Sequence, residues 1–213
     1  MRATANKILV KAYLNQKSAI QIKGPNDTTI ELLVGKEYEL NNRKKNPTIC
    51  EVIDNNSQYA YIKTGDKLLV HHNFLSDPDA NPRCIEHDPQ SGMALFSIPA
   101  GRHIFCKLDN DGNLSPTCDN ILVERLRNPI ESKFIIIPDT VKQEHNDRVK
   151  VTAVSPEIDF VKPGQTVLIK DKADYEICYS WNKEDRNAIK VWAGKFEDEE
   201  YGEEAGDILG IVQ

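Results

Sequence analysis

The feature that most constrains the fold is an internal repetition of three segments with the pattern of β-strands. The matching pairs are 6–14 (NKILVKAYL) with 119–127 (DNILVERLR), 61–70 (YIKTGDKLLV) with 160–169 (FVKPGQTVLI) and, more loosely, 103–108 (HIFCKL) with 207–212 (DILGIV). The pairs occur in the same order in both halves, at offsets of 113, 99 and 104 residues. The sequence therefore predicts two copies of one domain of about 100 residues, a typical domain size, with insertions in the loops.

Hydrophobic periodicity along the chain is almost entirely that of β-strands. No segment keeps an i, i+3, i+4, i+7 apolar stripe over three helical turns. Glycine turns separate the apolar segments, as at Gly65, Gly112 and Gly164. The segments that predict strands are 7–10 (KILV), 67–70 (KLLV), 149–154 (VKVTAV), 166–169 (TVLI) and 188–193 (AIKVWA). Many short strands with frequent turns favour an all-β fold of barrels or sandwiches.

A polar stretch separates the two copies. Residues 109–117 (DNDGNLSPT) contain glycine and proline and lie directly before the second copy. Polar segments of this kind are typical of domain boundaries. We therefore expect a first domain at residues 1–108, a linker at 109–118 and a second domain at 119–213.

Composition excludes several classes of function. The 213 residues carry a net charge of -6, and the isoelectric point is about 5.4, which disfavours binding to nucleic acid or to an anionic membrane surface. Residues 43–45 (RKK) are interpreted as a solvated loop. The sequence has no secretion-type apolar segment at its start and no run long enough to cross a membrane, so we expect a cytoplasmic protein. Five cysteines without a CxxC motif indicate reduced thiols.

One apolar run has two interpretations. Residues 131–141 (ESKFIIIPDTV) place four large apolar side chains in a row, Phe134 to Ile137, within an otherwise polar stretch. Periodicity favours a buried strand that ends at Pro138. The alternative is an exposed apolar segment that binds another protein.

The second half resembles the co-chaperonin (GroES) family from Asn120 to Gln213. Five segments carry the resemblance in order: DNILVERL, SKFIIIPDTVKQ, DRVKVTAV, VKPGQTVLI and AGDILGIV. In the first half, NKILVK and IKTGDKLLV carry it. Gln165 stands where the family has Asp, and Lys133-Phe134 stand where it has two glycines. The space for the family's roof hairpin holds only 54–60 and 155–159, and such a short roof resembles that of some phage-encoded co-chaperonins.

The resemblance implies both a fold and a function. The fold would be two tandem GroES-like β-barrel domains. SKFIIIPDTVKQ would be the mobile loop, with Ile135, Ile136 and Ile137 as the residues that bind a chaperonin. In the first domain, residues 18–25 occupy the same position, with Ile20, Gln21 and Ile22 as the weaker binding residues. The partners would be a GroEL-type chaperonin ring and further copies of the chain in a homo-oligomeric ring, with no cofactor.

Other groups of residues give weaker signals. His71, His72, Cys84 and His87 are four potential zinc ligands, but adjacent histidines on a strand point to opposite faces. Surface histidines and an unpaired cysteine are the alternative. The acidic segment 196–207 lacks the ligand order of a calcium loop and is interpreted as solvated. No catalytic motif is present, so we expect no enzyme and no catalytic residue.

Three functions remain open from the sequence. The first is a co-chaperonin that closes a chaperonin and assists protein folding. The second is a structural or assembly protein, of viral type, that uses the fold to form oligomers without binding a chaperonin. The third is an adaptor that binds other proteins through the edge strands of its sheets.

Overall fold

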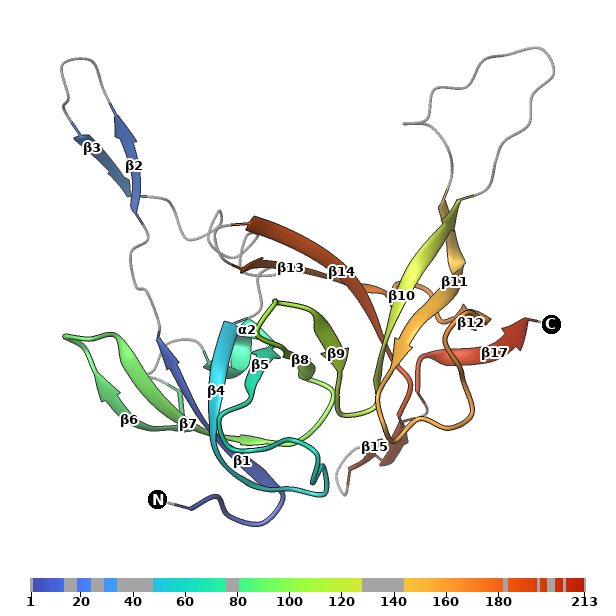
Figure 1. Cartoon of the computed structure of the whole chain (residues 1–213), viewed down its shortest axis with the longest axis horizontal. Helices are drawn as coiled ribbons and strands as arrows, with labels where there is room; N and C mark the ends of the chain where they lie inside the picture. Colours follow the sequence, from blue (N-terminus) through green and yellow to red (C-terminus); the bar gives the residue numbers. More distant parts are fainter. Residues whose placement is uncertain are drawn as a thin grey trace. The chain divides into compact units, whose positions relative to one another are not determined.

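The computed structural model shows an all-β chain with two antiparallel sheets, one of seven strands and one of six (Figure 1). The predicted fold class is therefore confirmed at the level of an all-β protein. The structure describes residues 2–13, 19–23, 29–33, 48–75, 81–127, 144–181, 184–194, 196–198, 202–204 and 206–212. The chain divides into two compact units, residues 1–100 and 101–213.

Strand order defines each sheet. The larger sheet runs β6 (Cys84–Asp88), β7 (Met93–Pro99), β1 (Lys7–Tyr13), β4 (Thr48–Asn56), β5 (Lys67–Val70), β8 (Ile104–Leu108), β9 (Leu114–Pro116). The smaller sheet runs β13 (Tyr175–Trp181), β14 (Glu184–Trp192), β10 (Asn120–Arg127), β11 (Glu144–Val154), β12 (Thr166–Ile169), β17 (Ile208–Val212). Between the described strands, the pairings close neither sheet into a barrel.

Two short pairs of strands and one helical turn lie outside the two sheets in the described part of the chain. Strands β2 (Ala19–Lys23) and β3 (Thr29–Leu33) form one separate antiparallel pair, and β15 (Phe196–Asp198) and β16 (Gly202–Glu204) form another. A single helical turn, α2 (His72–Leu75), follows β5. The connections β4–β5 and β11–β12 contain turns and no strand.

The strands coincide with the segments that the apolar pattern predicts. The runs 67–70 and 166–169 are β5 and β12, and the alternating segments 149–154 and 188–193 fall in β11 and β14. β-Branched residues such as Val149, Val151 and Val167 recur in these segments and pack well on a pleated surface. The turn glycines Gly65, Gly112 and Gly164 all have positive φ, where only glycine is free of Cβ hindrance.

Six strands of the two sheets follow the same order. Position by position, β6-β7-β1-β4-β5-β8 corresponds to β13-β14-β10-β11-β12-β17. The β1–β4 pair shifts register between Leu9 and Val10, and the β10–β11 pair shifts between Leu122 and Val123. These are matching residues at the offset of 113 found in the sequence. The two sheets therefore share their order and their local irregularity.

The turn before β5 and the turn before β12 have the same hydrogen bonds. Gly65 N donates to Val52 O at 2.8 Å, and Gly164 N donates to Val151 O at 2.8 Å. The φ angles of the two glycines are 88° and 91°. Both copies thus build this turn with one backbone geometry.

Gln165 takes the same structural role in the second copy as Asp66 takes in the first. In the first copy, Lys63 N donates to Asp66 Oδ2 at 2.7 Å. In the second copy, Lys162 N donates to Gln165 Oε1 at 2.7 Å. The amide oxygen of Gln165 accepts from the equivalent backbone donor, so both copies close this turn in the same way.

Each sheet buries its own apolar face. Burial of such side chains is the main favourable term in folding. The described core of the second sheet is Ile121, Val123, Val149, Val151, Ile158, Val161, Val167, Ile169, Val191 and Ala193. Fully buried side chains of the first sheet include Ile8, Leu9, Leu68, Leu69, Phe96 and Ile98.

Residues 109–118, expected as a linker, contain part of the larger sheet. Strand β9 lies within them and pairs with β8, with Leu114 opposite Leu108. The preceding turn is held by Asp109, whose Oδ1 accepts from Asn113 N at 2.8 Å. Hydrogen bonds from the Asn113 side chain and backbone lower the pKa of Asp109. Strand β8 belongs to the larger sheet in strand order, whereas the compact division of the chain falls before it, after residue 100.

Candidate functional site

The candidate site is the connection between the first two strands of each copy. In the second copy, β10 and β11 are antiparallel neighbours whose pairing extends from Ile121–Val154 to Arg127–Glu144 (Figure 1). The connection between them, residues 128–143, therefore leaves and returns at the same end of the pair. The other edges of β10 and β11 are occupied by β14 and β12.

The predicted residues of the second copy lie in this connection. Ile135, Ile136 and Ile137 are outside the described residues, and their role stays a prediction. What the structure describes is the base of the connection, two strands held in register on both sides.

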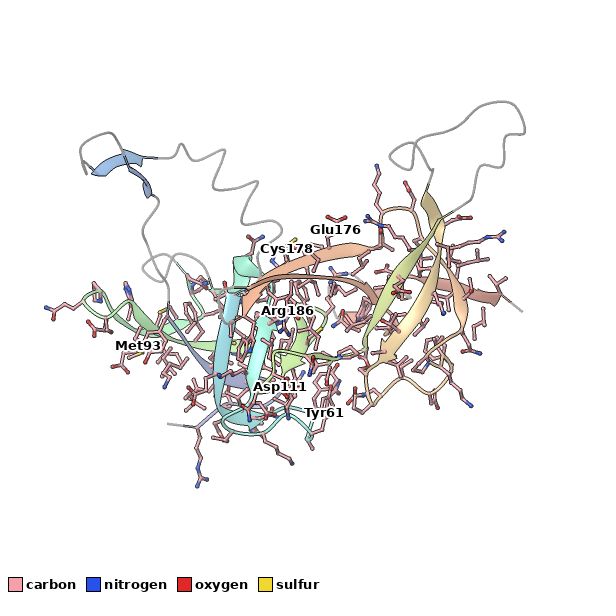
Figure 2. The ribbon with its side chains drawn as sticks, turned by 45° about the horizontal axis from the view of Figure 1, so that its top comes forward. Tyr61, Met93, Asp111, Glu176, Cys178 and Arg186 are labelled. Atoms are coloured by element: carbon pink, nitrogen blue, oxygen red, sulfur yellow. The ribbon has the colours of Figure 1, made fainter. Side chains whose placement is uncertain are left out.

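An ion-pair cluster fixes β10 close to this base. Arg125 Nε donates to Asp174 Oδ2 at 2.5 Å, and Arg125 Nη1 donates to Glu176 Oε1 at 2.8 Å. Glu176 belongs to β13, so the cluster connects β10 to a strand two positions away in the sheet (Figure 2). Burial lowers the pKa of Arg125, but the hydrogen bonds to Asp174 and Glu176 outweigh it and raise this pKa overall. The end of β10 is therefore anchored where the connection begins.

The first copy has a longer connection at the same position. It runs from 14 to 47, between β1 and β4, and contains the β2–β3 pair. The structure places Ile20, Gln21 and Ile22 in β2, opposite Leu32, Glu31 and Ile30 of β3. The resemblance implied a mobile loop at residues 18–25, and the backbone shows 19–23 paired with 29–33 as two antiparallel strands.

The described side chains among the four potential zinc ligands, those of His71, Cys84 and His87, do not form a metal site. His71 Nδ1 accepts from Asn73 N at 3.2 Å, and Cys84 donates its thiol hydrogen to Glu86 O at 3.4 Å. The side chain of His72 is outside the described set. Among the described side chains, no three histidine, cysteine or acidic residues are grouped as metal ligands.

Sequence inspection missed a buried polar cluster around Lys190. Lys190 lies on β14 and is 8% exposed, and its Nζ donates to Asn120 Oδ1 at 3.1 Å. The same nitrogen lies 4.9 Å from the ring centroid of Phe105 and 5.8 Å from that of Tyr175. The alternation of 188–193 places Lys190 on the polar face of its strand, and no local signal shows that this face is covered.

Burial changes the chemistry of this cluster. Loss of solvation lowers the pKa of Lys190 to about 8, although the charge of Asp207 opposes the shift. Burial raises the pKa of the nearby Cys106 thiol to about 12. Asn120 Nδ2 donates to the carbonyls of Ile104 at 3.0 Å and Thr117 at 2.8 Å. The cluster thus holds an amine and a neutral thiol inside the second unit and connects β14 to β8.

A second group of contacts holds the β8–β9 turn against the β13–β14 hairpin. Tyr179 OH donates to Gly112 O at 3.0 Å, and Arg186 Nη1 donates to Asp111 O at 2.9 Å (Figure 2). A side chain on Gly112 would overlap the ring of Trp181. These contacts and those of Lys190 make the β8–β9 hairpin an integral part of residues 101–213.

Comparison with known proteins assigns no family. No protein-family model matches the chain, and no curated protein matches it at a significant level. Within the described residues, no helix has the length and apolar character needed to cross a membrane.

Proposed function

We propose that the chain is a co-chaperonin-like protein of two tandem GroES-like β-barrel domains, which binds a chaperonin ring through the 128–143 connection and assists protein folding. The observation that carries the proposal is a connection of 16 residues between neighbouring antiparallel strands, with Ile135–Ile137 inside it. Connections of this length inside compact domains are uncommon and are frequently functional.

The repetition of the sheet supports this proposal. The long connection occurs between the same two strands in both copies, which share strand order and register. The connections β4–β5 and β11–β12 contain no strand, as a co-chaperonin with a shortened roof requires. Such a roof leaves room for a bulky folding substrate.

The energetics of three isoleucines suit a reversible lid. Burying each side chain contributes about 1.5–3 kcal/mol. A segment that becomes ordered on binding loses roughly 1–2 kcal/mol per residue in backbone entropy. One such contact is weak. Several contacts on one oligomer add by avidity, because each later contact is intramolecular.

The direct test is complex formation with a GroEL-type chaperonin in the presence of ATP. Wild-type protein should co-sediment with the chaperonin, and Ile136→Asp should reduce binding by more than about tenfold, since each 1.4 kcal/mol is a factor of ten. Phe160→Asp is the matched control, because Phe160 is an apolar side chain in a turn and is 51% exposed. It should bind as wild type does.

Two results would contradict the proposal. If Ile136→Asp unfolds while Phe160→Asp stays folded, the apolar run belongs to the core of the second domain. If neither wild type nor control binds any chaperonin, the chain is a structural or assembly protein. That second candidate is favoured by one observation, the exposed Leu209 and Ile211 on the edge strand β17.

A further inference from the structure

The regular backbone pairing of β10 ends close to Arg125. On the side of β14, no described residue pairs with β10 beyond Val123. On the side of β11, Arg125 lies opposite Val149, and the next pair, Arg127 with Glu144, follows an irregularity of register. The end of β10 from which the 128–143 connection leaves therefore has little support from backbone hydrogen bonds.

The first copy holds the corresponding strand end in a different way. At the offset of 113 residues, the counterpart of Arg125 is Ala12. Ala12 is buried and is paired on both sides, with Cys50 of β4 and with Ala94 of β7. The pairing of β1 with β7 continues to Tyr13, the last residue of the strand. The first copy therefore supports this end by backbone pairing, whereas the second copy has a charged side chain there.

The ion pairs of Arg125 lie where the backbone pairing stops. Glu176 of β13 is opposite Ile189 of β14, and Ile189 forms the last described pair of β14 with β10. Arg125 lies two residues beyond that pair and contacts both Asp174 and Glu176. A planar guanidinium can hold two carboxylates in one fixed geometry. The Arg125 side chain thus connects β10 to β13 where no backbone pair between β10 and β14 does so.

The two carboxylates belong to a segment that is itself held in place. Asp174 and Glu176 flank Tyr175, whose ring packs against Phe105 with centroids 5.2 Å apart. Successive side chains of an extended segment point to opposite faces, so this packing lies on the face away from the ion pairs. Arg125 is therefore bound to a segment that is fixed from its other face.

Solvent reaches this cluster of charges. The side chains of Arg125, Asp174 and Glu176 are 25%, 14% and 40% exposed. Dissolved salt weakens the attraction between partly exposed charges. Burial of apolar side chains is not screened in this way. The support that Arg125 gives to β10 should therefore decrease as the ionic strength rises.

We propose that Arg125 is a positioning residue for chaperonin binding, and that its ion pairs with Asp174 and Glu176 make the affinity depend on ionic strength. The inference rests on the proposed function. The ion pairs hold the end of β10 from which the 128–143 connection leaves, and a fixed end reduces the conformational entropy that is lost on binding. Ala12 carries no charge, so the 14–47 connection of the first copy has no such dependence at this position.

Amide hydrogen exchange of the purified full chain, without a chaperonin, tests whether the ion pairs hold β10. In wild type, exchange of residues 125–127 should become about two- to fivefold faster when NaCl is raised from about 0.05 M to about 1 M. Arg125→Met should exchange fast at both concentrations, and Arg125→Lys, which keeps the charge but not the two-carboxylate geometry, should be intermediate. Residues 121–123 should not change. Glu124→Gln is the matched control, because Glu124 is an exposed charge on the opposite face of β10.

Titration of a GroEL-type chaperonin with ATP, at the same two salt concentrations, tests the effect on binding. At low salt, Arg125→Met should bind about two- to fivefold more weakly than wild type for each contact, and Arg125→Lys should recover part of the loss. At about 1 M NaCl the two affinities should converge. Glu124→Gln should bind as wild type does at both concentrations. If Arg125→Met does not fold, Glu176→Gln, which removes one of the two ion pairs, takes its place.

Four outcomes would overturn the proposal. Wild-type exchange rates in folded Arg125→Met would show that the ion pairs do not hold the end of β10. Faster exchange with unchanged chaperonin affinity would make the ion pairs a matter of stability alone. A loss of affinity that is equal at both salt concentrations would exclude the dependence on ionic strength. Wild type that binds no chaperonin would refute the proposed function and the positioning role with it, while the exchange rates would still show whether the ion pairs hold β10.

Discussion

Lys190 has two opposite effects on this fold. Its burial is unfavourable, and its hydrogen bond fixes one arrangement of the strands around it. Its amine lies over two aromatic rings and donates a hydrogen bond to Asn120 Oδ1. Asp207 and Cys106 favour the protonated amine, and Arg102 disfavours it. Burial outweighs these charges and disfavours the protonated form. The amine is retained where an apolar side chain would pack without that cost, since it connects β14 to Asn120.

The free energy of unfolding should rise with pH between about 8 and 10.5 because of Lys190. The pKa is about 8 in the folded protein and near 10.4 in the unfolded chain, so the unfolded chain binds more protons in this window. Below pH 8, Lys190 is protonated in both the folded and the unfolded chain, so its deprotonation adds no stability there. We expect a gain on the order of 3 kcal/mol, at about 1.4 kcal/mol per pKa unit.

Urea unfolding of wild type and Lys190→Met across pH 7–10.5 measures this effect. The difference in unfolding free energy between the two proteins isolates Lys190 from the tyrosines and the other lysines. As the pH rises, wild type should become more stable relative to Lys190→Met. A difference that is independent of pH would mean that the amine is not desolvated in the folded protein.

Thiol reactivity should separate the cysteines into two groups. Cys50, Cys106 and Cys118 are buried, and burial raises the pKa of each thiol, that of Cys106 to about 12. Cys84 and Cys178 are partly exposed. A thiolate-selective reagent at pH 8 should therefore modify Cys84 and Cys178 first and all five cysteines only after denaturation. Rapid modification of Cys50 in folded protein would contradict the packing of the first sheet.

At the scale of elements, the sequence predicts which segments are strands better than it predicts which other segments pair with them or cover them. Apolar runs such as 67–70 and 166–169 coincide with β5 and β12, because their burial is decided within each sheet. Strand β9 was not predicted, since Leu114–Pro116 has no apolar pattern of its own and pairs only because β8 lies beside it. The burial of Lys190 depends in the same way on Phe105 and Tyr175, which are distant in sequence.

The sequence predicts the position of the candidate site in each copy but not the local structure of the connection. The repeat places a connection between the first two strands of each copy, and the structure confirms the strands on either side. In the first copy, the resemblance to the co-chaperonin family implied a mobile loop at residues 18–25, whereas Ala19–Lys23 is a strand paired with β3. Ile20, Gln21 and Ile22 alternate as a short strand would, but five residues are too few to predict a hairpin without its partner strand.

Gly112 should be the most sensitive glycine in the β8–β9 turn. Its φ is 79°, and a Cβ there would overlap the Trp181 ring. We expect Gly112→Ala to lower the free energy of unfolding by about 1–2 kcal/mol for the left-handed backbone and about 1–3 kcal/mol for the overlap.

Gly164→Ala is the matched control for Gly112→Ala. Its φ is 91°, and an added Cβ would have no heavy atom within 4 Å. It should lose only the backbone part, about 1–2 kcal/mol. Equal losses for the two variants, measured by urea unfolding, would show that Trp181 does not pack against the turn.

At the scale of the whole molecule, the repetition has a consequence for the proposed function. Each copy carries one long connection between its first two strands, so one chain presents two different segments, 14–47 and 128–143. In the proposed function, the second segment carries three isoleucines in a row, while the first carries Gln21 between two isoleucines. A polar middle residue weakens apolar burial. We therefore expect the second copy to contribute most of the affinity for a chaperonin.

In the proposed function, a homo-oligomeric ring would place many such segments on one assembly. Avidity then makes binding strong in total while each contact stays weak, as a lid that leaves in every cycle requires. The number of copies in that assembly determines how many segments meet the chaperonin at once.

The most direct test of this account is the mass of the complex formed when the protein is mixed with a GroEL-type chaperonin and ATP. Native mass measurement should show the chaperonin plus a whole number of 24.1 kDa chains, and Ile136→Asp should abolish that species while remaining folded. If wild-type protein at saturating concentration leaves the chaperonin at its own mass, the proposed function is wrong.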